Sequence, residues 1–179
     1  MKAYQDASLA PVRRAKALLE EMTLAEKIGQ LNQRLYGFRI YERKCVNGED
    51  TIELSEEFCQ EVEKYSGLGV LYGLYRADPW ADKNYETGLT GVLSKKAYNQ
   101  VQRYVLEHSR LGIPVMMSSE CPHGHQALDG YLLPVNLLAG ATFGTGCVPG
   151  KWPSAAEHGC GFCFNVDAGC VAGSQMGTQ

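Results

Sequence analysis

Residues 69–118 read GVLYGLYRADPWADKNYETGLTGVLSKKAYNQVQRYVLEHSRLGIPVMMS, and their pattern decides the fold. The apolar run 69–74 lies between glycines and predicts a buried strand. Ser94 is predicted to cap a long amphipathic helix whose apolar side carries Ala97, Val101, Tyr104, Val105 and His108. Gly112 is predicted to end this helix, and residues 113–118 predict a second buried strand. A strand, a helix and a strand in this order form the βαβ unit of a parallel sheet, so the predicted fold class is α/β.

Three further helices are predicted before this unit. Apolar residues recur at helical spacing in residues 13–22, which predicts the first. Thr23 and Glu26 have the spacing of a capping box and predict the start of the second. Ser55 is predicted to cap the third, and residues 34–41 fit either a strand or a loop.

The composition is that of one soluble globular domain, with 179 residues of which 45% are hydrophobic and 21% charged. No stretch approaches the roughly 20 apolar residues of a membrane helix, and no secretory signal is recognisable, so we expect a cytoplasmic protein without a membrane partner. The net charge is -3, from 17 basic and 20 acidic residues. Because these charges are interspersed, no basic stripe is present, and nucleic acid is not an expected partner.

The composition changes abruptly after Phe143. Residues 144–179 hold 4 of the 7 cysteines and 8 of the 20 glycines, and only three charged residues. Without a secretory signal, these cysteines are expected to be reduced thiols. Cys160, Cys163 and His158, with Cys147 or Cys170, have a spacing that zinc accepts. A single CxxC is weak evidence for zinc, however, so no metal or other cofactor is predicted, and a small metal-binding or interaction protein remains the alternative function.

Four segments together resemble a known enzyme family. They are YQDASLAPVRRAKALLEEMTLAEKIGQL (4–31), GVLYGLYRADPW (69–80), VQRYVLEHSRLGIPV (101–115) and SSECPHGHQALDGYLLPVNLLAGATF (118–143). In order and spacing they resemble the start of the catalytic domain of glycoside hydrolase family 3, the β-glucosidase-like enzymes. The resemblance implies a (β/α)8 TIM barrel with its active site at the carboxyl ends of the strands, and a carbohydrate substrate. A complete barrel takes about 250 residues, so we expect residues 1–143 to form the first few strand–helix units only.

The genetic code offers an explanation for residues 144–179. Family members carry a motif like LDVSRDPRWGR downstream, which this chain lacks. Read one base later, Met176 followed by Gly177 forces tryptophan, and Gln175 followed by Met176 forces lysine or arginine. The remaining residues of 168–178 permit the rest of that motif. We therefore expect a frameshift near Phe143, and residues 144–179 to be disordered or loosely packed.

The resemblance implies a substrate-binding role for Glu120, because family members carry an acidic residue there that accepts hydrogen bonds from sugar hydroxyls. The alternative is an ordinary loop carboxylate. His123 and His125 follow in the same turn, and either one lies near the sugar or both hold the loop through backbone carbonyls. The catalytic nucleophile and acid/base of the family are expected outside this chain.

Arg76, Asp78 and Trp80 follow the earlier predicted strand and are further candidates for substrate binding. The apolar face of Trp80 suits stacking on a sugar ring. Equally, Trp80 could fill the rim of the barrel.

Overall fold

The computed structural model describes residues 2–119, 124–130, 132, 141, 163–165 and 170–172. Its α-helices are α1 (Pro11–Glu21), α2 (Leu24–Leu31), α3 (Glu56–Tyr65) and α4 (Gly91–Glu107). Two short 3-10 turns, Ala3–Gln5 and Gly37–Arg39, precede the first strand. The strands are β1 (Tyr41–Val46), β2 (Glu49–Leu54), β3 (Val70–Tyr72), β4 (Met116–Ser118), β5 (Cys163–Asn165) and β6 (Cys170–Ala172). None of the helices in the described ranges is long and apolar enough to cross a membrane.

The predicted βαβ unit is confirmed. β3 pairs in parallel with β4, with Val70 opposite Met116 and Tyr72 opposite Ser118, and α4 lies between the two strands in the sequence. A third segment extends this pairing on the other edge of β3. Tyr36 forms a parallel bridge to Tyr72, and the Val70 amide donates to the Asn32 carbonyl at 3.4 Å. The order across the sheet is therefore segment 32–36, β3 and β4.

The predicted helix starts are confirmed for α2 and α3. The Thr23 hydroxyl accepts the Glu26 amide at 3.3 Å, and the Glu26 carboxylate accepts the Thr23 amide at 2.8 Å, which completes the capping box. Ser55 caps α3 by accepting the Phe58 amide at 3.3 Å. Each cap satisfies amides that have no partner within the first turn of the helix.

The predicted bounds of α4 were wrong at both ends. The helix begins at Gly91 with Thr90 as its N-cap residue, and Ser94 lies inside it. The reason is that its buried side starts one turn earlier than expected, at Leu93. The helix ends at Glu107, well before Gly112. His108 is its C-cap residue: its backbone amide donates to the Tyr104 carbonyl, and its ring stacks on that of Tyr104 with 3.9 Å between ring centres.

The hairpin of β1 and β2 was not predicted from the sequence. Tyr41 pairs with Leu54 and Val46 with Glu49 in an antiparallel register. Asn47 and Gly48 form its turn, both with positive φ (53° and 81°). Asn-Gly is the strongest short signal for such a turn, so this hairpin was recognisable from the sequence.

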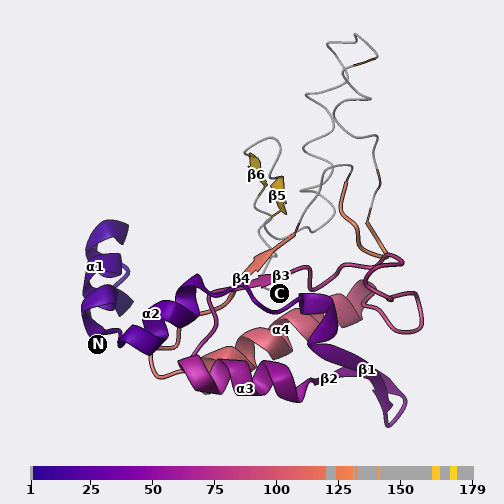
Figure 1. Cartoon of the computed structure of the whole chain (residues 1–179), viewed down its shortest axis with the longest axis horizontal. Coiled ribbons are helices and arrows are strands. Elements are labelled where there is room, and N and C mark those ends of the chain that lie inside the picture. The colour runs from indigo at the N-terminus through magenta and orange to yellow at the C-terminus, as the bar shows by residue number, and fades with distance from the viewer. Residues whose placement is uncertain are drawn as a thin grey trace.

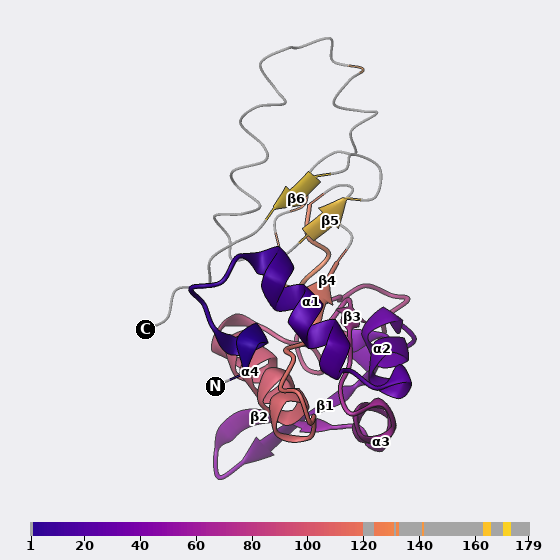
Figure 2. The same ribbon diagram turned by 90° about the vertical axis from the view of Figure 1, so that its left-hand side faces the viewer.

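The hydrophobic core lies between the hairpin, helices α3 and α4, and the parallel sheet. Figures 1 and 2 show α3 and α4 on the same side of the β3–β4 pair. Burial of these apolar faces supplies the main stabilising free energy of the domain. The most deeply buried side chains of this core are Ile40, Tyr41, Phe58, Val62, Leu68, Leu71, Ala97, Val101 and Val105.

The two N-terminal helices contribute little to this core. α1 buries none of its residues and lies at one end of the molecule (Figure 1). On α2, Leu24, Ile28 and Leu31 are exposed, Leu24 to 74% and Leu31 to 88%. Their spacing of four and three places them on one side of the helix, and we call them the α2 apolar row.

Within residues 144–179 the structure describes only β5 and β6, which pair antiparallel with Asn165 opposite Cys170. The prediction that this segment is disordered or loosely packed, and the frameshift that would explain it, stay predictions. The partial (β/α)8 barrel also stays a prediction, because one described parallel sheet of this size does not distinguish it from other α/β folds.

Candidate functional site

The candidate site lies at the carboxyl ends of the three parallel segments. Tyr36, Tyr72 and Ser118 are opposite one another there, in neighbouring positions across the sheet. Ser118 is buried and its hydroxyl accepts a hydrogen bond from the Gln33 amide group at 3.2 Å. Because parallel strands end at the same edge, the loops that follow β3 and β4 start side by side, as they do where α/β proteins bind ligands.

The loop after β3 carries three of the predicted site residues, and the structure brings all three together. It turns at Gly73, which has φ +70° and whose amide donates to the Ser118 carbonyl at 2.8 Å. The Arg76 guanidinium donates to the Asp78 carboxylate at 2.8 Å and to the Tyr72 hydroxyl at 2.7 Å. Its central carbon lies 4.6 Å from the centre of the Trp80 ring, a cation–π contact.

Trp80 also belongs to an aromatic cluster. Its ring centre is 5.2 Å from that of Tyr36 and 5.1 Å from that of Phe38, both nearly edge to face. Phe38 is buried, whereas Trp80 is 51% and Tyr36 40% exposed. An indole and a phenol thus meet solvent next to each other at the end of the sheet. Tyr36 was not predicted as a site residue, because residues 34–41 show no clear pattern for a strand that would end at this edge.

Within this loop, Arg76 and Asp78 neutralise each other. Burial of the Asp78 carboxyl raises its pKa, but the backbone hydrogen bond from Ala81 and the ion pair with Arg76 together outweigh burial, and the pKa of Asp78 lies below its usual value. Asp78 is therefore ionised at neutral pH and fully engaged inside the loop. Such a carboxylate is a poor general acid and a good structural anchor.

The loop after β4 returns to the loop after β3. Arg76 and Ala127 form an antiparallel bridge, and the Ala77 amide donates to the Gln126 carbonyl at 2.9 Å. His125 contacts Tyr75 edge to face, with 6.1 Å between ring centres. Glu120 and His123 lie outside the described residues. The sequence places them in the connection between β4 and this returning segment, so they remain candidates.

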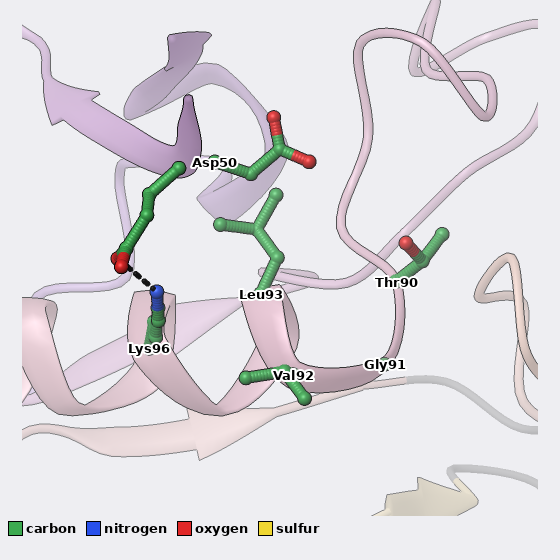
Figure 3. A pocket seen from close by; sticks show the side chains of 7 residues that line it. Asp50, Thr90, Gly91, Val92, Leu93 and Lys96 are labelled. Atoms are coloured by element: carbon green, nitrogen blue, oxygen red, sulfur yellow. Dashed lines mark hydrogen bonds and ion pairs between the residues drawn. The ribbon is translucent and has the colours of Figure 1, made fainter. Parts of the chain in front are cut away.

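Two hollows in the described surface lie elsewhere. One, of about 310 Å³, separates the hairpin from the start of α4 (Figure 3). Figure 3 shows Leu93 and Lys96 pointing from α4 toward the hairpin, where Lys96 pairs with Glu49 at 3.1 Å. The amide of Gly91 at the helix start already donates to the Asp129 carboxylate at 2.6 Å, which occupies the place an anionic ligand would take.

The second hollow, of about 590 Å³, runs along α2 and α3 beside the α2 apolar row. Neither hollow is lined by Arg76, Asp78 or Trp80. Among the described residues no group of three or more His, Cys, Asp or Glu side chains could hold a metal ion. His158, Cys147 and Cys160 of the alternative zinc site lie outside the described residues.

No protein-family model matches the chain. A distant similarity to one curated protein links the chain to glycosidase-type enzymes. That protein, from Formosa agariphila, bears the name "Putative beta-xylosidase" and is 27% identical over 180 aligned residues. The aligned region covers 98% of this chain but 22% of the relative, so the chain spans about a fifth of the length of the relative.

Proposed function

We propose that residues 1–143 form the first strand–helix units of the (β/α)8 barrel of a β-glucosidase-like enzyme of glycoside hydrolase family 3, and that they hold the sugar. The observation that carries this proposal is the position of Trp80. An exposed indole lies at the carboxyl edge of a parallel sheet, in a loop held by the Arg76–Asp78 ion pair and next to Tyr36. Carbohydrate-binding sites combine such a flat apolar surface with charged hydrogen-bond acceptors, a role we give to Glu120.

Two features of the described surface support a larger barrel. Among the described residues, the segment 32–36 has β3 as its single strand neighbour, so its other edge is open. The α2 apolar row is exposed on the helix that leads into this segment. In a closed barrel the first strand pairs with the last, and the last helix packs beside the first. Both features would then be covered.

Catalysis is proposed to come from residues outside this chain. A retaining glycosidase needs two carboxyl groups about 5 to 5.5 Å apart, one as nucleophile and one as acid/base. The Asp78 carboxylate of the loop after β3 is held by Arg76 and by the Ala81 amide, and we do not assign it either role. The chain itself is therefore proposed to be inactive, with Arg76, Asp78, Trp80, Glu120 and His123 serving the sugar-binding side of the intact site.

Sugar binding tests this proposal directly. Titration of the chain with xylobiose and with cellobiose, followed by calorimetry, should give weak binding of at least one disaccharide. Trp80→Ala should abolish it, whereas Trp152→Phe, a change of the other tryptophan, should leave it intact. Hydrolysis of aryl β-glucosides and β-xylosides should stay at background. Absence of binding to both sugars, or binding that survives Trp80→Ala, would contradict the proposal.

A further inference from the structure

The Asp78 carboxylate holds both the backbone and the ring of Trp80. Its Oδ1 accepts the amide of Ala81 at 2.8 Å, which fixes the turn that carries Trp80. Its Oδ2 accepts Nε and Nη2 of Arg76, both at 2.8 Å. The same carboxylate therefore fixes the turn and orients the guanidinium that lies against the indole.

Arg76 is held from a second direction by the sheet. Its Nη1 donates to the Tyr72 hydroxyl at 2.7 Å, and Tyr72 is the last residue of β3. Three nitrogen atoms of the Arg76 guanidinium are thus hydrogen-bonded, to Asp78 and to Tyr72, and these bonds restrict rotation of its plane. The Trp80 ring, 4.6 Å from the guanidinium carbon, rests against a fixed surface.

Trp80 remains half exposed in spite of these contacts. An exposed aromatic side chain on a loop would normally exchange between rotamers, and a ligand that stacks on it would have to select one of them. A ring that is already held in one orientation avoids this cost.

We propose that Arg76 and Asp78 are positioning residues that hold the Trp80 indole ready for a flat, hydroxyl-rich ring, and that they do not themselves contact the sugar. The identity of the ligand as a sugar rests on the proposed function, whereas the positioning of Trp80 does not. Loss of either residue should loosen the ring, which would then be held only from the side of Tyr36 and Phe38, and should weaken ligand binding by about 2- to 12-fold, the cost of ordering one side chain on binding.

The spectroscopy of Trp80 isolates this effect. The chain holds two tryptophans, so Trp152→Phe makes Trp80 the single indole reporter. In that background, acrylamide quenching and fluorescence anisotropy are measured for Asp78→Ala, Asp78→Asn, Arg76→Met and Arg76→Lys. Arg110→Met is the matched control, because it removes another two-pronged arginine–carboxylate pair, with Glu26 at 2.7 Å, which lies outside the loop that carries Trp80.

Quenching should rise and anisotropy should fall most in Asp78→Ala and Arg76→Met. Asp78→Asn keeps an acceptor for the Ala81 amide and should give an intermediate value, as should Arg76→Lys, which keeps the charge without the planar group. Quenching and anisotropy of folded Arg110→Met should match those of the parent. Affinity for xylobiose or cellobiose should fall in the same order.

The outcomes separate the two proposals. Altered quenching in a chain that binds neither sugar supports the positioning of Trp80 and contradicts the proposed function. Unchanged quenching and anisotropy in folded Arg76→Met and Asp78→Ala would overturn the positioning role. Loss of far-UV circular dichroism in all four variants would also overturn it, since the pair would then be a general structural element.

Discussion

Glu26 and Arg110 are 84 residues apart in the sequence and form a two-pronged ion pair. Nε and Nη2 of Arg110 donate to the two Glu26 carboxylate oxygens at 2.9 and 2.7 Å. Glu26 is 4% exposed and also completes the capping box with Thr23. One carboxylate therefore starts α2 and fastens it to the connection between α4 and β4.

Because of this ion pair, we expect the free energy of unfolding to fall in acid. The bonds from Arg110, and those from Thr23, lower the pKa of Glu26 from 4.5 to about 2 in the folded chain. Because the folded pKa lies below the unfolded one, the contribution of Glu26 is fully present above pH 4.5 and is lost as the pH falls toward 2. We expect the free energy of unfolding to drop over this window by no more than about 3 kcal/mol, as measured by urea denaturation at several pH values.

Glu26→Gln is the control for this prediction. Glutamine keeps the shape but not the charge-assisted bonds, and at pH 7 it should cost about 1.5 to 3 kcal/mol. The difference between the variant and the parent should shrink as the pH falls from 4.5 toward 2. A difference that stays constant over that window would show that another group is responsible for the acid sensitivity.

Gly69→Ala should disrupt the start of β3. A Cβ atom at Gly69 would lie 1.9 Å from the Gln30 carbonyl oxygen and 2.4 Å from its carbon, so backbone would have to move. We expect a loss of roughly 3 kcal/mol, at the upper end for overpacking. Gly48→Ala in the hairpin turn has open space around it, and its positive φ alone should cost about 1 kcal/mol. Equal drops in melting temperature for Gly69→Ala and Gly48→Ala would show that the clash with Gln30 does not determine the stability of Gly69→Ala.

Glu120→Gln tests the sugar-binding role of Glu120 in a frame-repaired, full-length enzyme. Glutamine loses the charge-assisted hydrogen bonds to sugar hydroxyls, a cost of about 1.5 to 3 kcal/mol. kcat/KM should therefore fall about 10- to 150-fold, at tenfold per 1.36 kcal/mol, while the melting temperature changes little. A near-normal kcat/KM would identify Glu120 as an ordinary loop carboxylate.

The DNA sequence tests the frameshift. Read one base later from about codon 143, it should run through a DPRWGR-like motif at codons 173–178 and continue as a long open frame. Amplification and sequencing of codons 140–180 and the region beyond decides this. An alternative frame interrupted by stop codons would refute it.

Most helices and the parallel sheet could be predicted because their signals are local. Thr23 with Glu26, and Ser55 ahead of Phe58, are caps that depend on three or four neighbouring residues. Gly69 and the apolar run after it mark β3 in the same way. The start of α4 was predicted incorrectly because both Thr90 and Ser94 are acceptable N-cap residues. Burial of Leu93 in the core requires the helix to begin before this residue, so Thr90 is the N-cap.

The candidate site was predictable only in part. Arg76, Asp78 and Trp80 lie within five residues of one another, so the sequence itself keeps them together. Tyr36 joins them through a bridge to Tyr72 across the sheet, and sequence patterns do not specify which strands become neighbours. The Arg110 contact to Glu26 is of the same long-range kind and left no signal in the sequence.

The central place of β3 affects how the chain forms during translation. Segment 32–36 leaves the ribosome before β3, and β4 follows after α4. Each new strand can therefore pair with the free edge of the strand made just before it: β3 with segment 32–36, and β4 with β3. We expect the sheet to grow in the order of synthesis, with each new helix packed as its unit is completed. Pausing of the ribosome between codons for β3 and β4 would then leave a partly built sheet with the edge of β3 exposed, the state in which a chaperone would be needed most.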